Sequence, residues 1–536
     1  MKLSGKVSLM QIFHGKIITC DPKDHVYQYL VEDHGKILHV GNELPSEYAK
    51  CENRIELGEQ ALLPAFGDGH IHFSNWSIVA FAYFDVREAK NFEDIRAIIQ
   101  NSVKTHLKAK IYVGFGISRH SVEEKRLITR TELDAIHFEK PLVIVGYDGH
   151  TLFANSAMME KFPEKVKNAR GYHADEGHLF NEAYYAGLDF ATSFISPITL
   201  IKGIINGYDL VAKKGIGMIH SVESIGFPAD LDVTLALLIG RAQSHKNDIQ
   251  TRLYFQTMDL NKVKKRKLPR IGGCFATALD GCFGACDAAL VKPYSNDPEN
   301  TGILFYSDED VNKFTTESNR AGLQIQMHAI GSAAVKQGIR ALEAALLDFH
   351  RDNHRHTLIH TCLIDKEDLA KCAKLGIGIT LQPGFLVSPL EPTSYLHEIL
   401  GDRANISSPM RSIIDAGVHM SGGSDGPVTH PDPIEGIYGA CNHPYDPSQS
   451  VTIAEALKMY TYEIAWTSFD EKERGSLEAG KIADLVILNQ NPLALQPKEL
   501  RELHVECLFL NGHPYKSGMG IGSMLWHAIR GRKKLI

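Results

Sequence analysis

Between about residues 62 and 421, the chain alternates short apolar runs with segments of helical periodicity. Polar or glycine residues end most of these runs. Such alternation is typical of βαβ units around a parallel sheet, and eight runs are the number that closes a (β/α)8 (TIM) barrel. We therefore predict an α/β fold with this barrel. The predicted strands lie near 62–72, 215–220, 253–256, 272–280, 323–328, 357–360, 377–381 and 418–421.

Both ends of the chain carry short β-rich segments with hairpin-type turns, Asp33-His34-Gly35 near one end and Asn511-Gly512 near the other. Two such sets can complete each other, which predicts a small composite β-sandwich. The expected units are that sandwich, a barrel, a long insertion after its first strand that acts as a lid, and a basic tail. The sandwich is expected to comprise 1–63 and 475–520, and the barrel 64–474. The insertion is expected at 75–210, within the limits of the barrel, and the tail at 521–536.

The composition is that of an ordinary globular protein, with 44% hydrophobic and 23% charged residues among 536. A net charge of −7 without a basic stripe argues against a nucleic-acid partner. The sequence has neither a signal-peptide pattern nor an apolar run long enough to span a membrane. Nine cysteines without CxxC pairs indicate reduced thiols. We therefore expect a cytoplasmic protein with a small-molecule substrate and no membrane partner.

His70 and His72 stand at the end of the first predicted strand. Residues i and i+2 of a strand point to the same face, so the two imidazoles converge, as ligands of Zn²⁺ do. The alternative is a pair of ordinary surface or hydrogen-bonded histidines, because HxH is a common pattern.

Polar residues at the ends of other predicted strands argue against the interpretation that His70 and His72 are ordinary histidines. His328, His360 and Asp425 follow the fifth, sixth and eighth runs, and the carboxyl ends of barrel strands form the catalytic face. A catalytic zinc ion keeps a position for water, whose pKa it lowers to about 7. A carboxylate beside that water can take its proton and pass it to a leaving group.

With these motifs in place, the chain resembles the metal-dependent amidohydrolase superfamily, in particular its family 3 branch. The resemblance implies that Asp425 is a metal ligand and the general base, that His360 is a catalytic ligand, and that a C–N bond of an amide or cyclic amide is hydrolysed. The other implied metal ligands are His70, His72 and His328. The motifs that carry the resemblance span 64–72, 147–156, 328–331, 423–428 and 475–486.

The chain departs from the family at the fourth strand. Members with two ions usually carry a lysine there, whose position falls near Ala276. The methyl group of alanine cannot bridge ions, so we expect one ion, most simply zinc, or a bridge from a residue that the sequence does not identify. Cys274 or Cys282 could supply a thiolate, although buried cysteines usually only pack, and Lys292 lies well past the strand.

The second departure follows the fifth strand, where deaminases of the superfamily carry a glutamate after the histidine. Here His328 is followed by Ala329-Ile330-Gly331-Ser332, which favours amide hydrolysis. An aromatic-amine deaminase, or a degenerate homologue that binds a ligand without turnover, remain the alternatives. A homodimer is possible.

Three further residues are candidate substrate contacts: His150, His220 and Glu182. The alternatives are a turn-stabilising role for His150 and a solvated lid surface for Glu182. The basic tail could meet an acidic partner, but a solvated helix end explains it equally simply.

Overall fold

The computed structural model describes residues 10–107, 109–137 and 139–531. Its centre is a parallel sheet of eight strands in the order β5-β12-β13-β14-β15-β16-β17-β18. Each strand overlaps one of the eight predicted runs, so the barrel prediction is confirmed. The strands are β5 (Phe66–Ile71), β12 (Ile216–Glu223), β13 (Gln250–Phe255), β14 (Arg270–Gly273), β15 (Gln324–Ala329), β16 (Thr357–His360), β17 (Gly378–Leu381) and β18 (Met420–Gly422).

The barrel closes where its first and last strands meet. The backbone N–H of Asp425, just after β18, donates to the carbonyl oxygen of His70 on β5 at 2.8 Å. Apolar side chains of the strands pack outward against a ring of helices. This closure brings the ends of β5 and β18 together, and with them the residues predicted to bind metal. The surrounding helices are α7 (Pro197–Lys213), α8 (Leu231–Asn247), α9 (Leu260–Arg266), α10 (Asp308–Arg320), α11 (Ser332–Asp348), α12 (Lys366–Leu375), α13 (Thr393–Leu400), α14 (Met410–Asp415), α15 (Pro433–Cys441), α16 (Ile453–Met459) and α17 (Tyr462–Thr467).

The first barrel strand begins later than the prediction near 62–72. Residues up to Pro64 belong to β4 (Arg54–Pro64), which pairs with β1 (Gln11–Ile18) and β19 (Leu485–Leu488) in a second sheet. The apolar run is continuous because it serves two sheets in succession, and a hydropathy pattern does not show where one sheet ends.

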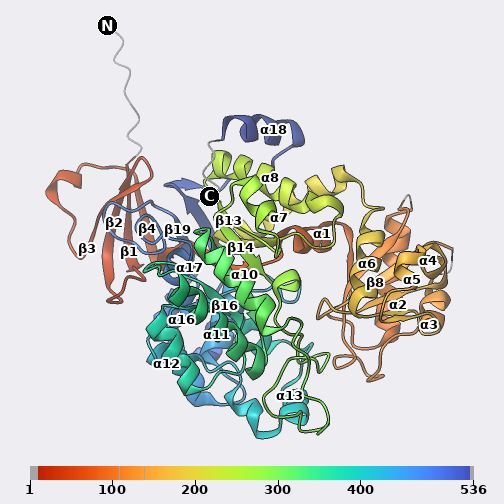
Figure 1. The fold of residues 1–536 in the computed structure, drawn as a ribbon. Helices are drawn as coiled ribbons and strands as arrows, with labels where there is room; N and C mark the ends of the chain where they lie inside the picture. Colours follow the sequence, from red (N-terminus) through yellow and green to blue (C-terminus); the bar gives the residue numbers. More distant parts are fainter. Residues whose placement is uncertain (1–9, 108, 138, 532–536) are drawn as a thin grey trace.

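That second sheet has seven strands in the order β21-β20-β19-β4-β1-β2-β3 and unites the two ends of the chain. Its apolar side chains, among them Phe13 and Phe509, form a separate core. In Figure 1 it lies beside the barrel, with red N-terminal strands next to blue C-terminal ones. The remaining strands are β2 (Val26–Asp33), β3 (Lys36–Gly41), β20 (Val505–Leu510) and β21 (His513–Pro514).

The insertion between β5 and β12 begins with α1 (Phe73–Ala82) and then builds a six-stranded sheet of its own, in the order β10-β11-β9-β8-β7-β6. Two hydrophobic clusters pack against it, and Figure 1 shows it on the opposite side of the barrel from the terminal sheet. Its strands are β6 (Phe84–Asp85), β7 (Tyr112–Ile117), β8 (Leu142–Gly146), β9 (Leu152–Ala154), β10 (Tyr172–His173) and β11 (His178–Leu179). Its helices are α2 (Phe92–Thr105), α3 (Arg130–Ile136), α4 (Ser156–Lys161), α5 (Glu164–Lys167) and α6 (Asn181–Thr192).

In the described ranges, no single helix has the length and hydropathy needed to cross a membrane; α6 and α7, bent by 101° between them, meet those criteria only as a pair. The predicted tail forms α18 (Ile521–Arg530), which packs on α8 through Met524, Ala528 and a His245–His527 contact of 2.8 Å. Residues 532–536 of that tail lie outside the described part of the chain.

Helix α16 offers a stability test away from the site. It starts with a capping box between Thr452 and Glu455, and Arg411 of α14 donates two bonds to the same carboxylate. Burial alone would raise the pKa of Glu455, but Arg411 and the cap lower it to about 2. Glu455→Gln is expected to reduce the free energy of unfolding at pH 7 by about 1–2 kcal/mol, because the side chain is partly solvated.

The sign of the pH dependence follows from the lowered pKa. The contribution is complete above the unfolded pKa of about 4.3 and is lost as the pH falls toward 2. Denaturant unfolding at pH 7 and pH 3 measures it, and the gap between Glu455→Gln and the wild type should narrow at pH 3. The control is Glu93→Gln, which alters an exposed pair with Arg96. Equal losses in both variants would contradict the assignment.

Candidate metal centre

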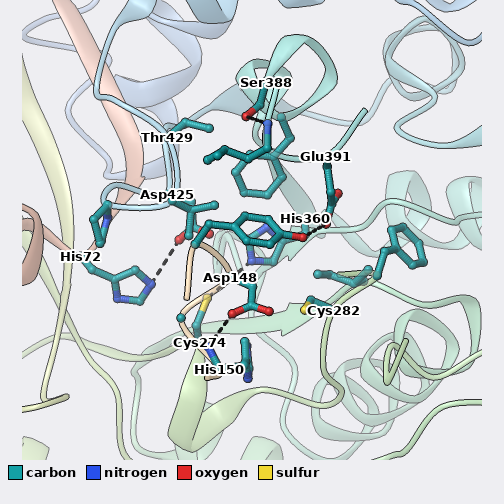
Figure 2. Close-up of a pocket in the computed structure, with 18 of the residues that line it drawn as sticks. His72, Asp148, His150, Cys274, Cys282, His360, Ser388, Glu391, Asp425 and Thr429 are labelled. Atoms are coloured by element: carbon teal, nitrogen blue, oxygen red, sulfur yellow. Dashed lines mark hydrogen bonds and ion pairs between the residues drawn. The ribbon is translucent and has the colours of Figure 1, made fainter. Parts of the chain in front are cut away.

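His70 and His72 converge on one carboxylate. His70 is the penultimate residue of β5, and His72 directly precedes α1. Their Nε2 atoms lie 3.2 and 3.1 Å from the same oxygen of Asp425, Oδ1. All three side chains are buried, and Figure 2 shows the Asp425 carboxylate facing His72. The predicted pair and the predicted carboxylate therefore share one point in space.

The two remaining histidines stand beside this point with their rings oriented by neighbours. Nδ1 of His360 lies 2.6 Å from Oε1 of Gln382, and Nε2 of His328 lies 3.0 Å from the carbonyl oxygen of Gly281. An imidazole that donates through one nitrogen keeps a lone pair on the other. His360 thus offers Nε2 and His328 offers Nδ1 as metal ligands.

The protonation states suit a cation. Burial lowers the pKa of His70, lowers that of His360 to about 4, and with the neighbouring His360 lowers that of His328 well below its usual range. Burial alone would raise the pKa of Asp425, but its contacts with His70 and His72 hold it well below the ordinary value. At neutral pH, His70, His328 and His360 are therefore neutral and Asp425 is an anion, the forms that bind metal.

A cysteine at the fourth strand joins the cluster. The Sγ atom of Cys274, just after β14, lies 3.2 Å from Nε2 of His70 and 3.6 Å from Nε2 of His360. Ala276, which the sequence comparison placed at the lysine position, lies on the following 3-10 turn, Phe275–Thr277. The residue at this strand end that contacts the histidines is therefore Cys274.

The side chains present fit a divalent cation. Potential ligand atoms of His70, His72, Cys274 and Asp425 all lie within 4.8 Å of one another, and so do those of Cys274, His328 and His360. Oδ1 of Asp425 is buried, and although the rings of His70 and His72 lie near it, no described residue is aligned to donate a hydrogen bond to it. Such an oxygen is costly to bury unless a cation compensates it. Imidazole, carboxylate and thiolate ligands together are typical of zinc.

Two of the proposed ligands sit on strained backbone. His360 has φ +69° and Asp425 has φ +55°, in the left-handed region that residues other than glycine rarely occupy. Such strain costs of order 1–3 kcal/mol per residue and concentrates at functional sites. The fold therefore holds both side chains toward the cluster at an energetic cost.

A cavity of about 150 Å³ opens from the cluster toward the insertion. Its wall is mostly apolar, with Phe115, Tyr184 and Leu188 from the insertion facing Phe275 and Leu386 from the barrel loops. The insertion thus contributes one wall of the cavity.

Two further carboxylates, Glu391 and Asp148, also line the cavity (Figure 2). Tyr147 donates from its hydroxyl to Glu391 at 2.8 Å, and burial raises the pKa of Glu391 to about 7. Sequence reasoning missed Glu391 because 244 residues separate it from Tyr147. Tyr147 and Asp148 could have been identified as candidates, since both lie in the motif 147–156 that carries the family resemblance.

The three candidate substrate contacts have different surroundings. His150 lines the cavity, and its backbone N–H donates to Asp148 at 3.0 Å. His220 is fully buried on β12, away from the cavity wall, and neither ring nitrogen has a hydrogen-bond partner within the described ranges. Glu182 pairs with Arg170 at 2.8 Å on the rim of a larger outer groove. The structure brings only His150 to the cavity.

The chain is similar to several known proteins. A sequence model of the amidohydrolase family matches residues 259–515. The chain is 25% identical to the putative amidohydrolase YtcJ of Bacillus subtilis (strain 168), over 94% of this chain and 98% of that protein. It is 23% identical to the N-substituted formamide deformylase of Arthrobacter pascens, over 94% and 97%.

Among solved structures, an uncharacterized metal-dependent hydrolase from Pyrococcus horikoshii OT3 has the same fold, with a TM-score of 0.73 and 22% identity over 91% of this chain and 99% of that one. These matches confirm the family resemblance, and the class of protein that it implies is the metal-dependent hydrolases. Within that class, the chain is similar to proteins of the amidohydrolase family over most of its length.

Proposed function

We propose that the protein hydrolyses a C–N bond of a small amide or cyclic amide, with a divalent cation, most simply zinc. The observation that carries the proposal is the convergence of the Asp425 carboxylate with His70 and His72 at 3.2 and 3.1 Å, at the inner end of an apolar cavity. The residues that would hold the cation are His70, His72, His328, His360 and Asp425.

The charge and the position of each residue determine its proposed role. A bound cation would polarise the substrate carbonyl and make the attacking water more acidic. Asp425, ionised before the reaction, accepts the proton of that water and returns it to the leaving nitrogen. His360 lines the cavity as a neutral ring fixed by Gln382, so it contacts the substrate at the reacting end.

The cavity supports an amide with an apolar substituent. Its wall is mainly aromatic and aliphatic, and burying such a substituent contributes about 25 cal/mol per Å². The similarity to a formamide deformylase is in line with this substrate class.

Deamination is the second candidate, because guanine and adenosine deaminases share the fold. Against it, the hydroxyl of Ser332, which stands where other family members carry an acidic residue, accepts a hydrogen bond from the backbone of Val291. Ser332 therefore joins the start of α11 to the long loop after β14, and it supplies no carboxylate for proton transfer. A degenerate, non-catalytic homologue is disfavoured because all five proposed ligands are present.

Metal removal tests the proposal. Chelated protein is expected to lose activity by at least about 100-fold on a panel of N-substituted amides and lactams, and to regain it when Zn²⁺ is added back. The same panel includes aromatic amines, for which ammonia release is measured. Ammonia release without amide cleavage would favour the deaminase, and no turnover of any compound by the reloaded protein would favour the degenerate homologue. Zinc as the native metal, the unit limits, a cytoplasmic location and a homodimer stay predictions.

A further inference from the structure

Cys274 differs from the other fully buried cysteines in what surrounds it. Cys372 and Cys441 pack inside the main apolar core, as inert thiols do. Cys274 instead lies between two imidazoles, with Sγ 3.2 Å from Nε2 of His70 and 3.6 Å from Nε2 of His360. A purely packing role does not explain a thiol in contact with two ring nitrogens.

The backbone around Cys274 is built to hold it there. Gly272 and Gly273 precede it with φ of +101° and +135°, and a side chain at Gly272 would lie 1.9 Å from the carbonyl oxygen of Gln326. The chain can therefore turn at the end of β14 only because these residues are glycines. The N–H of Cys274 then donates to Oε1 of Gln256 at 3.0 Å, which fixes the new direction.

Cys274 is common to both potential ligand groups. The first group consists of His70, His72, Asp425 and Cys274. The second consists of Cys274, His328 and His360. The first group supplies four protein donors, the number that closes a tetrahedral zinc site. The second supplies three, the number that leaves a position for water or substrate.

We propose that Cys274 replaces the missing lysine and, as a thiolate, bridges two cations. The inference rests on the proposed function only in that the site binds metal. The expectation of one ion depended on the absence of a bridging group at the fourth strand, and Cys274 supplies that group. The thiol proton is released to solvent when the metal binds, and the ion on the side of His328 and His360 is the one open to substrate.

The test is metal content and Co²⁺ absorption of the full-length protein. Wild-type protein reloaded with Zn²⁺ is expected to hold about two ions per chain. Reloaded with Co²⁺, it is expected to show a thiolate-to-cobalt charge-transfer band in the near ultraviolet. Cys274→Ser and Cys274→Ala should lose the band and bind about one ion. Cys282→Ser is the matched control, since Cys282 lines the same cavity but belongs to neither ligand group, and it should match the wild type.

Each possible result either supports or contradicts the proposed bridge by Cys274. One ion per wild-type chain with a band that Cys274→Ser removes would make Cys274 a terminal ligand and overturn the bridge. No band in wild-type protein would overturn ligation altogether. Two ions and the expected band in a protein that cleaves no amide would leave the bridge standing and contradict the proposed function. A thermal unfolding scan of each metal-free variant separates lost ligation from misfolding.

Discussion

Asp425→Asn is expected to lower kcat/KM for amide hydrolysis by about 1,000-fold, which corresponds to about 4 kcal/mol of transition-state stabilisation. The side chain keeps its shape, but an amide cannot accept the proton of the attacking water. It also replaces an anion beside His70 and His72 with a neutral group, so metal affinity is expected to fall as well.

Measuring bound metal along with kcat and KM separates these two effects. If Asp425→Asn is assayed with saturating Zn²⁺ and its metal content equals that of the wild type, the remaining loss in kcat reports the missing base. Thr429→Val is the matched control, because Thr429 lines the same cavity and bonds only to the backbone of Ser424. Activity of Asp425→Asn within fivefold of the wild type would rule out its role as the base.

The sequence predicted the barrel well, and it placed the candidate site residues at one rim, because both inferences depend on local patterns. Apolar runs that end in polar residues mark strand ends, and the order of the runs places those ends at one rim. His328 and His360 lie at the carboxyl ends of β15 and β16, and Asp425 lies three residues after β18, so strand order alone placed them at one rim.

The sequence could not show which side chain at the fourth strand reaches the histidines, because backbone turns decide its direction. The family pattern puts the lysine position near Ala276, and Cys274 was one of two candidate thiols. The left-handed turn at Gly272 and Gly273 directs Cys274 to the histidines. The pairings between residues of the cavity wall could not be predicted from the sequence either. The Tyr147–Glu391 contact joins the insertion to a barrel loop, and such pairings depend on tertiary packing rather than on periodicity.

Asp280 is the residue whose loss should most damage the fold near the site. Its fully buried carboxylate accepts three backbone N–H bonds, from Ala289, Ile330 and Gly331, at 2.7 to 2.9 Å. It also lies 3.5 Å from Nε2 of His328. The carboxylate therefore ties the long loop after β14 to the turn after β15. That loop includes Gly281, whose carbonyl oxygen orients the ring of His328.

Asp280→Ala is expected to lower the free energy of unfolding by about 4 kcal/mol, because three buried donors lose their acceptor at once. Asp280→Asn should recover only part of this loss, since Oδ1 of Asp280 accepts from Ile330 and Oδ2 accepts from Ala289 and Gly331, and an amide can present only one acceptor oxygen. Urea unfolding midpoints measure both, with Asp352→Ala as the control for an exposed carboxylate. Metal content should fall in parallel, because His328 loses its orientation. An Asp280→Ala midpoint equal to that of Asp352→Ala would show that the loops hold together without this carboxylate.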